Sequence, residues 1–378
     1  MNDFDLEVHR ADLPILERLV PLNHCSQAPA SRRTLEAAQR YLTSWSERGM
    51  DWEAWMGQVE VARSTFARLI GADPEDVAVG SSVSQLASSF ASALDFDGQR
   101  AEIVVDADEF PTVSHVWRAV ERRGASVRAV DLGESGGVVN AADLRLDERT
   151  RLVSISQGCY ANGELRDLGG LSETVHNAGA LLFVDAYQAL GTLPVNVHDL
   201  GVDALASGCL KYLLGVPGLA FMYVRRELSA DLRPTATGWF GRRDPFSFDP
   251  ALDWADGARR FDLGTPAIFE AYVCTAGMQW LLDVGIENVR QRTMVLTDRL
   301  LDMCAERGLD VAGPRKAHQR TPLTAIRVPD AHAVEAALID RGFVASARGP
   351  VIRFAPHFYN SLDDVDGALD ALQAVLTE

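Results

Sequence analysis

Two stretches of this 378-residue chain, LLFVDAYQALG (residues 181–191) and ALASGCLKYLLG (residues 204–215), predict both its fold and its chemistry. The first is an apolar run that ends in the carboxylate of Asp185. The second places Lys211 where no other charge stands nearby. Only two lysines occur among the 36 Lys and Arg residues. Arginine stays protonated, whereas a desolvated lysine can lose its proton and form a Schiff base, so Lys211 is predicted to be catalytic.

Apolar stretches alternate with amphipathic ones around this region. We predict helices within residues 33–70 and 264–308, where Trp45, Trp52 and Trp55 lie on apolar faces of the first region. Predicted strands cover 76–79, 102–106, 126–131, 151–156, 181–185, 204–207 and 219–224, with helices at 84–95, 112–124 and 168–179. Apolar strands that alternate with amphipathic helices are typical of an α/β fold, whose mostly parallel sheet is covered on both faces.

The end of the chain has a different pattern, which predicts a second domain. Residues 309–378 return to short strands and two helices, the last of which begins at Ser361 with a capping-box-like Asp364. We predict a large domain at 21–285 with a seven-stranded sheet. The smaller α+β domain combines 1–20 with 286–378.

Composition narrows the class of protein. A net charge of −17 argues against nucleic acid and against an anionic membrane surface as partners, and favours a small-molecule substrate. The five cysteines are scattered, which predicts neither a metal site nor a disulfide framework. No apolar run approaches the roughly 18 residues of a membrane span. Together with the acidic N-terminus, which has no signal pattern, these features predict a cytoplasmic protein.

Chemically distinct residues follow the predicted strands. In open α/β sheets, ligands bind beyond the carboxyl ends of the strands. Residues 80–85, GSSVSQ, open a helix whose N–H groups suit a phosphate, although an ordinary serine N-cap is the favoured interpretation of this motif taken alone. Phe110 supplies an aromatic face, Asp185 a carboxylate and Lys211 an amine. Pyridoxal 5'-phosphate needs all four, because it has a phosphate, a flat ring, a protonated pyridine nitrogen and an aldehyde.

The motifs FVDAYQALG (183–191), LGVD (200–203) and KYLLGVPG (211–218) resemble the class V aminotransferase family, which has the type I fold of pyridoxal-phosphate enzymes. The resemblance covers nearly the whole chain. Residues 22–26 are similar to the family's entrance loop. Residues 260–266 are similar to a segment lent by a neighbouring subunit, and residues 353–360 to a segment whose arginine binds the substrate carboxylate.

The resemblance implies a role for each matching position. Lys211 forms the Schiff base, Asp185 pairs with the pyridine nitrogen, and Gln188 bonds the phenolic oxygen. Arg353 binds the substrate carboxylate as a bidentate fork. Thr265 comes from the partner chain, so a homodimer is implied. The remaining implied positions are Phe110 stacked on the ring, Val83 and Ser84 at the phosphate, Tyr160 near the ring, and Asn23, His24 and Trp239 lining the substrate pocket.

Departures from the family pattern bear on the reaction. Leu210 replaces the histidine that many members carry before the lysine, which removes a contact to phosphate or ring. Residues 305–378 contain no cysteine, which argues against the persulfide mechanism of cysteine desulfurases. Kynureninases carry histidine where Gln188 stands. The remaining resemblance is to the isopenicillin N epimerase-like and cysteine S-conjugate lyase-like branch, which includes enzymes of antibiotic pathways such as those to lincosamides.

The predicted reaction is C–S bond cleavage by β-elimination on a cysteine S-conjugate. Decarboxylation-coupled oxidative deamination, transamination, epimerisation and kynureninase-like hydrolysis stay open beside it. A pyridoxal-phosphate-binding protein without catalysis is the non-enzyme possibility, and the joint presence of Lys211, Asp185 and Arg353 argues against it.

Overall fold

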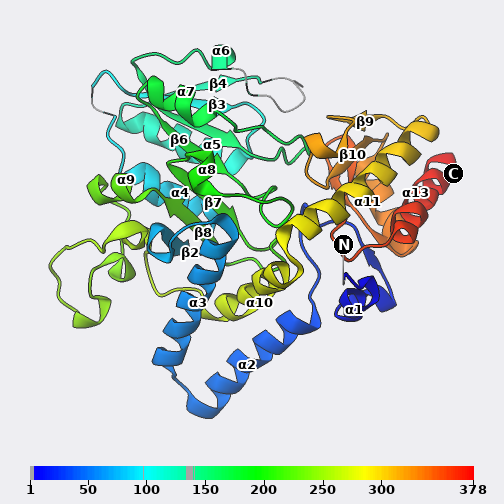
Figure 1. Ribbon diagram of the computed structural model, residues 1–378, viewed down its shortest axis with the longest axis horizontal. Helices are drawn as coiled ribbons and strands as arrows, with labels where there is room; N and C mark the ends of the chain where they lie inside the picture. Colours follow the sequence, from blue (N-terminus) through cyan, green and yellow to red (C-terminus); the bar gives the residue numbers. More distant parts are fainter. Residues whose placement is uncertain (1–3, 97, 133–138, 140) are drawn as a thin grey trace.

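The computed structural model describes residues 4–96, 98–132, 139 and 141–378, and the strands predicted between residues 76 and 224 are all present in it. They form one seven-stranded sheet in the order β2-β8-β7-β6-β5-β3-β4 (Figure 1). All its strand pairs are parallel except those of β8, which is antiparallel to β2 and β7. The strands are β2 (Val77–Gly80), β3 (Glu102–Asp106), β4 (Ser126–Val130), β5 (Thr150–Ser156), β6 (Leu181–Asp185), β7 (Ala204–Gly208) and β8 (Ala220–Val224).

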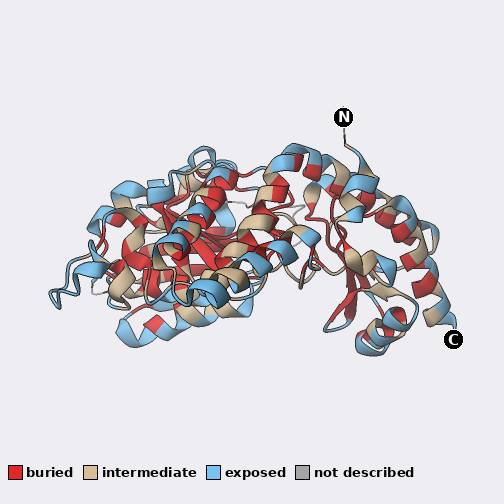
Figure 2. Cartoon of the chain, turned by 90° about the horizontal axis from the view of Figure 1, so that it is seen from below, coloured by how far each residue is buried: buried red, intermediate tan, exposed pale blue. Residues whose placement is uncertain are grey.

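Both faces of the sheet are buried, because successive side chains of a strand point to opposite faces. On β6, Leu182 and Val184 belong to one hydrophobic cluster and Phe183 to the other. Figure 2 shows the buried residues gathered on the strands between the helical layers. The first face is covered by α3 (Trp52–Ile70), α6 (Ala141–Leu144), α7 (Leu171–Asn177), α8 (Val197–Leu200) and α10 (Ile268–Val284), and the second by α4 (Val83–Ser92), α5 (Pro111–Ala119) and α9 (Arg226–Asp231).

The C-terminal part has a core of its own. Its four-stranded antiparallel sheet has the order β12-β13-β10-β9, and β1 pairs with β11 in a separate two-stranded parallel sheet. The strands are β1 (Val20–Pro21), β9 (Val311–Ala312), β10 (Thr324–Arg327), β11 (Phe343–Val344), β12 (Ser346–Arg348) and β13 (Val351–Phe354), and the helices are α11 (Ile286–Glu306), α12 (Ala331–Asp340) and α13 (Leu362–Thr377). The capping box of Ser361 and Asp364 starts α13, as predicted.

The N-terminal residues contact both parts. Arg10, on α1 (Leu6–Ala11), pairs with Asp364 at 2.7 Å, and α1 lies beside the C-terminal part in Figure 1. Leu13, by contrast, belongs to a cluster of the large sheet. The division into 21–285 and 1–20 with 286–378 therefore stays a proposal. No helix formed by the described residues combines the length and apolar composition that a membrane span needs.

Helix α2 (Arg32–Arg48) runs along the lower edge of the molecule in Figure 1, away from the sheet. Trp55 of α3 is only 6% exposed, as predicted, but Trp45 of α2 is 55% exposed. The face of α2 that carries Trp45 is thus not buried by the residues that the structure describes, unlike the face of α3 that carries Trp55. Short 3₁₀ helices complete the structure: η1 (Pro14–Glu17), η2 (Pro74–Asp76), η3 (Val120–Arg123), η4 (Trp239–Gly241), η5 (Pro245–Ser247), η6 (Gly257–Phe261) and η7 (Ala317–Gln319).

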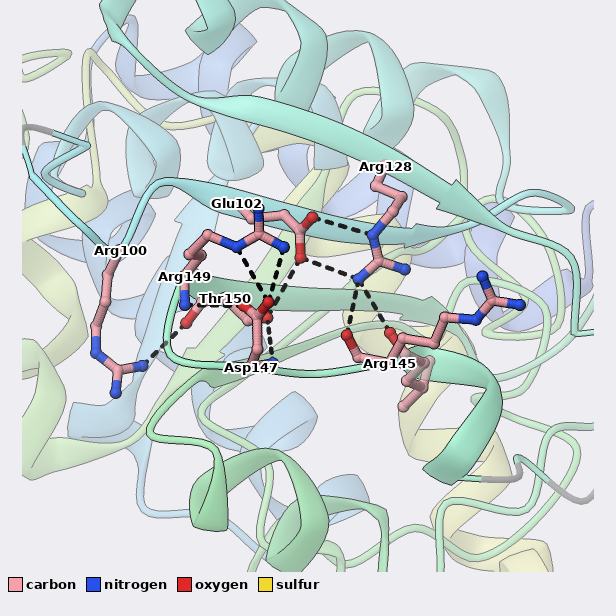
Figure 3. Close-up of polar contacts among 8 residues, drawn as sticks. Arg100, Glu102, Arg128, Arg145, Asp147, Arg149 and Thr150 are labelled. Carbon is pink, nitrogen blue, oxygen red and sulfur yellow. Dashed lines mark hydrogen bonds and ion pairs between the residues drawn. The ribbon is translucent and has the colours of Figure 1, made fainter.

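Polar contacts join β3, β4 and the start of β5 near one edge of the large sheet (Figure 3). Arg128 of β4 donates to both carboxylate oxygens of Glu102, at 3.0 and 2.9 Å, and Thr150 at the start of β5 donates to the same carboxylate at 3.3 Å. The hydrogen bond from Arg128 lowers the pKa of Glu102. These charges are thus paired within the chain.

Candidate active site

A cavity of about 380 Å³ opens beyond the carboxyl ends of β5, β6 and β7. Its size is within the usual range of small-molecule sites. It brings together residues of both parts of the chain, including most of those predicted from sequence. The predicted residues that line it are Val83, Ser84, Phe110, Tyr160, Asp185, Gln188, Lys211 and Arg353.

Lys211 follows β7 and its amine is largely desolvated. Nζ lies 4.3 Å from the ring centroid of Tyr187 and 5.5 Å from that of Phe110. Among the described residues, no carboxylate lies within ion-pair distance of this amine. Burial lowers the pKa of Lys211 to about 8, although the charge of Asp185 opposes this shift. The amine can therefore be neutral near physiological pH, as a nucleophile or a base requires.

The carboxylate of Asp185 ends β6 and is buried. Its Oδ1 accepts a hydrogen bond from the backbone N–H of Tyr187 at 2.9 Å. Burial raises the pKa of Asp185, while that hydrogen bond and the positive charge of Lys211 lower it. Gln188 donates to the carbonyl of Cys25 at 3.0 Å, and its Oε1 is buried without a hydrogen-bond partner among the described residues.

The start of α4 forms part of the wall of the cavity. Ser82 caps this helix by accepting a hydrogen bond from the backbone N–H of Gln85 at 3.2 Å. The serine N-cap expected from the sequence is therefore present. The next residues, Val83 and Ser84, both line the cavity. In the part of the chain that the structure describes, the Ser84 hydroxyl makes no hydrogen bond. Free donors at a helix N-terminus favour an anion.

Arg353 reaches the cavity from β13 of the C-terminal part and is buried. It donates to the carbonyl of Tyr160 at 2.8 Å and to the hydroxyls of Ser26 and Ser346 at 2.9 and 2.8 Å. These bonds hold the guanidinium in one orientation, and no described carboxylate forms an ion pair with it. The ring of Tyr160 packs edge-on against Phe110, with 5.1 Å between the centroids.

Asn23, His24 and Trp239, which we expected in the substrate pocket, do not line this cavity. His24 is fully buried, and its ring bonds the carbonyl of Ala355 and the hydroxyl of Tyr359 instead. Asn23 forms a backbone bridge with Ala355. Trp239 packs against the aromatic rings that follow it in the sequence.

Thr265 also lies outside the cavity, on the surface. Its predicted role belongs to a second subunit, so that role stays a prediction. Sequence reasoning missed Cys25, Ser26, Tyr187 and Arg348, which line the cavity as well. Tyr187 stands between two predicted site residues, a signal that could have identified it.

The model of the class V aminotransferase family matches residues 23–350. The chain belongs to the class V aminotransferase family. Among the curated members of this family, an uncharacterised aminotransferase YcbU of Bacillus subtilis is 36% identical over 97% of both chains. A kynureninase of Deinococcus radiodurans is 30% identical over 91% of this chain and 85% of its own.

Solved structures share the fold of this chain. A mutant of C-DES, whose glycine ligand is covalently linked to its PLP cofactor, superimposes with a TM-score of 0.88 at 20% identity, over 96% of this chain and 98% of that one. The predicted type I fold is therefore confirmed, and so is the prediction of an enzyme family that depends on pyridoxal 5'-phosphate.

The residues of the cavity fit this cofactor. Asp185 offers a buried carboxylate without a cation in ion-pair contact among the described residues, Gln188 has an unpartnered amide oxygen, and Lys211 presents a desolvated amine. Phe110 exposes its ring to the cavity, and the start of α4 suits the phosphate. Each chemical group of pyridoxal 5'-phosphate thus has a complementary residue at one edge of the sheet.

Proposed function

We propose that this chain is a pyridoxal-phosphate-dependent C–S lyase that acts on a cysteine S-conjugate by β-elimination. The observation that carries the proposal is the desolvated amine of Lys211 in one cavity with the fixed guanidinium of Arg353 and the buried carboxylate of Asp185. A base, a carboxylate-binding group and a cofactor-holding acid are the parts that removal of an α-proton requires.

In this proposal Asp185 holds the protonated ring nitrogen, Phe110 stacks on the ring, and Val83 and Ser84 bind the phosphate. Tyr160 lies beside Phe110 and closes the same wall. When bound, the cofactor supplies an electron sink for the bonds at Cα of an amino acid. Substrate binding and proton transfer are assigned to side chains of the protein.

Arg353 holds the substrate carboxylate, since its guanidinium is already oriented by Ser26 and Ser346. Lys211 then accepts the α-proton through Nζ, which its lowered pKa permits. Loss of the proton from Cα and of a thiolate from Cβ leaves an unsaturated product, which water converts to pyruvate and ammonia.

Purified enzyme loaded with cofactor tests the proposal when it is incubated with S-substituted cysteines, kynurenine and ordinary amino acids, and the products are identified by mass. Thiol and pyruvate in equal amounts support β-elimination. Kynureninase-like hydrolysis is the second candidate, because a kynureninase is among the relatives, and anthranilate with alanine would establish it instead.

Three further products would each replace β-elimination with a different reaction. A keto acid formed only when an amino acceptor is present would indicate transamination. An inverted α-carbon would indicate epimerisation, and an aldehyde one carbon shorter than the substrate would indicate decarboxylation-coupled oxidative deamination. Binding of the cofactor without any of these products would leave a binding protein without catalysis.

The pKa of Lys211 predicts how the apoenzyme takes up its cofactor. Only the neutral amine attacks the aldehyde, so the rate of covalent attachment should rise with pH and level off above a midpoint near 8. An ordinary lysine would give a midpoint near 10.4. Stopped-flow absorption at constant ionic strength measures this rate, with a blocked lysine peptide as the control. A midpoint close to that of the peptide would contradict the desolvated environment.

A homodimer is part of the proposal. Thr265 is exposed, as a residue lent to the neighbouring site must be, and apolar side chains stand exposed on α2 at Leu35, Leu42 and Trp45. Light scattering after gel filtration is expected to give twice the mass of the chain. A monomer at micromolar concentration would remove this part of the proposal.

The cellular setting and the family branch also stay proposals. We propose a cytoplasmic location, supported by five cysteines that are all free and buried. The narrower branch, similar to isopenicillin N epimerase and cysteine S-conjugate lyases of antibiotic pathways, is supported by the motifs of the sequence alone.

A further inference from the structure

Arg348 lines the cavity but has no partner in the part of the chain that the structure describes. Its side chain forms no ion pair and no hydrogen bond with any described residue, and the residue is exposed. Some exposed arginines, such as Arg149 and Arg226, pair with a carboxylate, whereas Arg348 combines the lack of a described partner with a place in the cavity lining. Arg348 is therefore a cation left free at a cavity wall.

The hairpin of β12 and β13 places Arg348 close to Arg353. Ser346 pairs directly with Arg353 in this antiparallel ladder, and Arg348 follows Ser346 by two residues. Residues two apart on a strand share a face, so Arg348 and Arg353 are diagonal neighbours on one face. Such neighbours are about 7–8 Å apart at the backbone, within reach of one ligand that has two acidic groups.

One cation of the cavity has no assigned partner once the proposed ligands are placed. Its lining contributes three cations, Lys211, Arg348 and Arg353, against one carboxylate, Asp185. The ring nitrogen takes Asp185, and the substrate's α-carboxylate takes Arg353. The cofactor's phosphate is assigned to the start of α4. One guanidinium, that of Arg348, remains without an anion.

We propose that Arg348 selects substrates whose side chain carries a second carboxylate, such as a cysteine S-conjugate that ends in an acid. This inference rests on the proposed function for the position of the substrate, and it adds the substrate class. Arg353 cannot serve both carboxylates, because Ser26, Ser346 and the Tyr160 carbonyl already fix its orientation. Arg348 has no such restraints and can turn toward a side-chain carboxylate.

The test compares two ligands of nearly the same shape that differ in charge, S-carboxymethyl-L-cysteine and S-carbamoylmethyl-L-cysteine. Glutamate and glutamine form a second pair that has no C–S bond. Dissociation constants come from the change in absorption of the bound cofactor, and kcat/KM comes from released thiol. We expect the wild type to prefer the acid of each pair by about tenfold, the size of a partly exposed charge-assisted bond.

In the variant Arg348→Gln, the ratio of acid to amide affinity should fall close to one for both pairs, mainly because the acids bind more weakly. The control Arg315→Gln removes the same charge from an exposed site outside the cavity and should retain them. High salt should reduce the wild-type preference, since the contact is near solvent. Arg353→Gln should weaken the acid and the amide alike.

The outcomes separate this inference from the proposed function. If no thiol is released but the wild type binds glutamate more tightly than glutamine, and Arg348→Gln abolishes that difference, the inference holds and the C–S lyase proposal fails. If thiol is released equally from both conjugates, the lyase proposal holds and the inference fails. An unchanged preference in Arg348→Gln, or no preference in the wild type for either pair, overturns the role of Arg348.

Discussion

Replacing Lys211 with alanine is expected to abolish covalent attachment of the cofactor and to reduce turnover by about 10³-fold or more, because the chain loses both its nucleophile and its base. The variant should fold normally, since Lys211 Nζ forms no ion pair with the described residues and its burial opposes the charged form. The absorption band of the attached cofactor should be missing after reconstitution, and borohydride should leave no cofactor mass on the protein.

The chain offers a matched control for this experiment, because Lys316 is its only other lysine. Lys316 lies in the polar loop before η7 and outside the cavity. Lys316→Ala should retain the band, the activity and a borohydride adduct that maps to the peptide containing Lys211. A borohydride adduct found on Lys316 in the wild type would remove the basis of the proposed function. Full activity of the Lys211→Ala enzyme would do the same.

Much of the fold could be predicted because local patterns and burial coincide in this chain. The apolar run of Leu182, Phe183 and Val184 has side chains in both clusters of the large sheet, as a strand covered on both faces requires. The placement of Asp185 and Lys211 followed from the same pattern, since parallel strands bring their carboxyl ends to one edge. Four chemically independent groups at that edge then indicated one cofactor.

The rest depended on contacts that no local pattern contains. His24 looks like a pocket residue in sequence, but its ring is taken up by Ala355 and Tyr359, more than 300 positions away. Sequence places Trp45 on an apolar helix face, and the structure leaves that residue 55% exposed on α2, at the lower edge of the molecule in Figure 1. Arg348 lines the cavity because the register of the β12–β13 hairpin places it diagonally to Arg353, and this register is not evident from the sequence. Long-range packing and register decide such positions.

Asp185→Asn is expected to separate cofactor binding from catalysis. The amide cannot balance the positive charge of the protonated ring nitrogen, so turnover should fall by about 10²–10³-fold, the usual cost of losing one preorganised electrostatic group. Lys211 is unchanged, so the cofactor should still be attached covalently and the borohydride adduct should remain. Asp185→Glu keeps the charge on a longer side chain and should recover part of the activity. Rapid-mixing kinetics with saturating cofactor measure both effects.

Thermal unfolding of the apoenzyme distinguishes this role from a structural one. Burial raises the pKa of Asp185, so ionising this carboxyl destabilises the folded apoenzyme. The destabilisation is present at pH values above the raised folded-state pKa and disappears below the unfolded-state value of about 3.9. Near pH 7, Asp185→Asn should therefore leave the Tm of the apoenzyme unchanged or raise it, while the loaded enzyme gains less from its cofactor than the wild type does. A clear drop in the Tm of the apoenzyme would instead make Asp185 a structural residue, and the loss of turnover would no longer indicate a charge held for the cofactor.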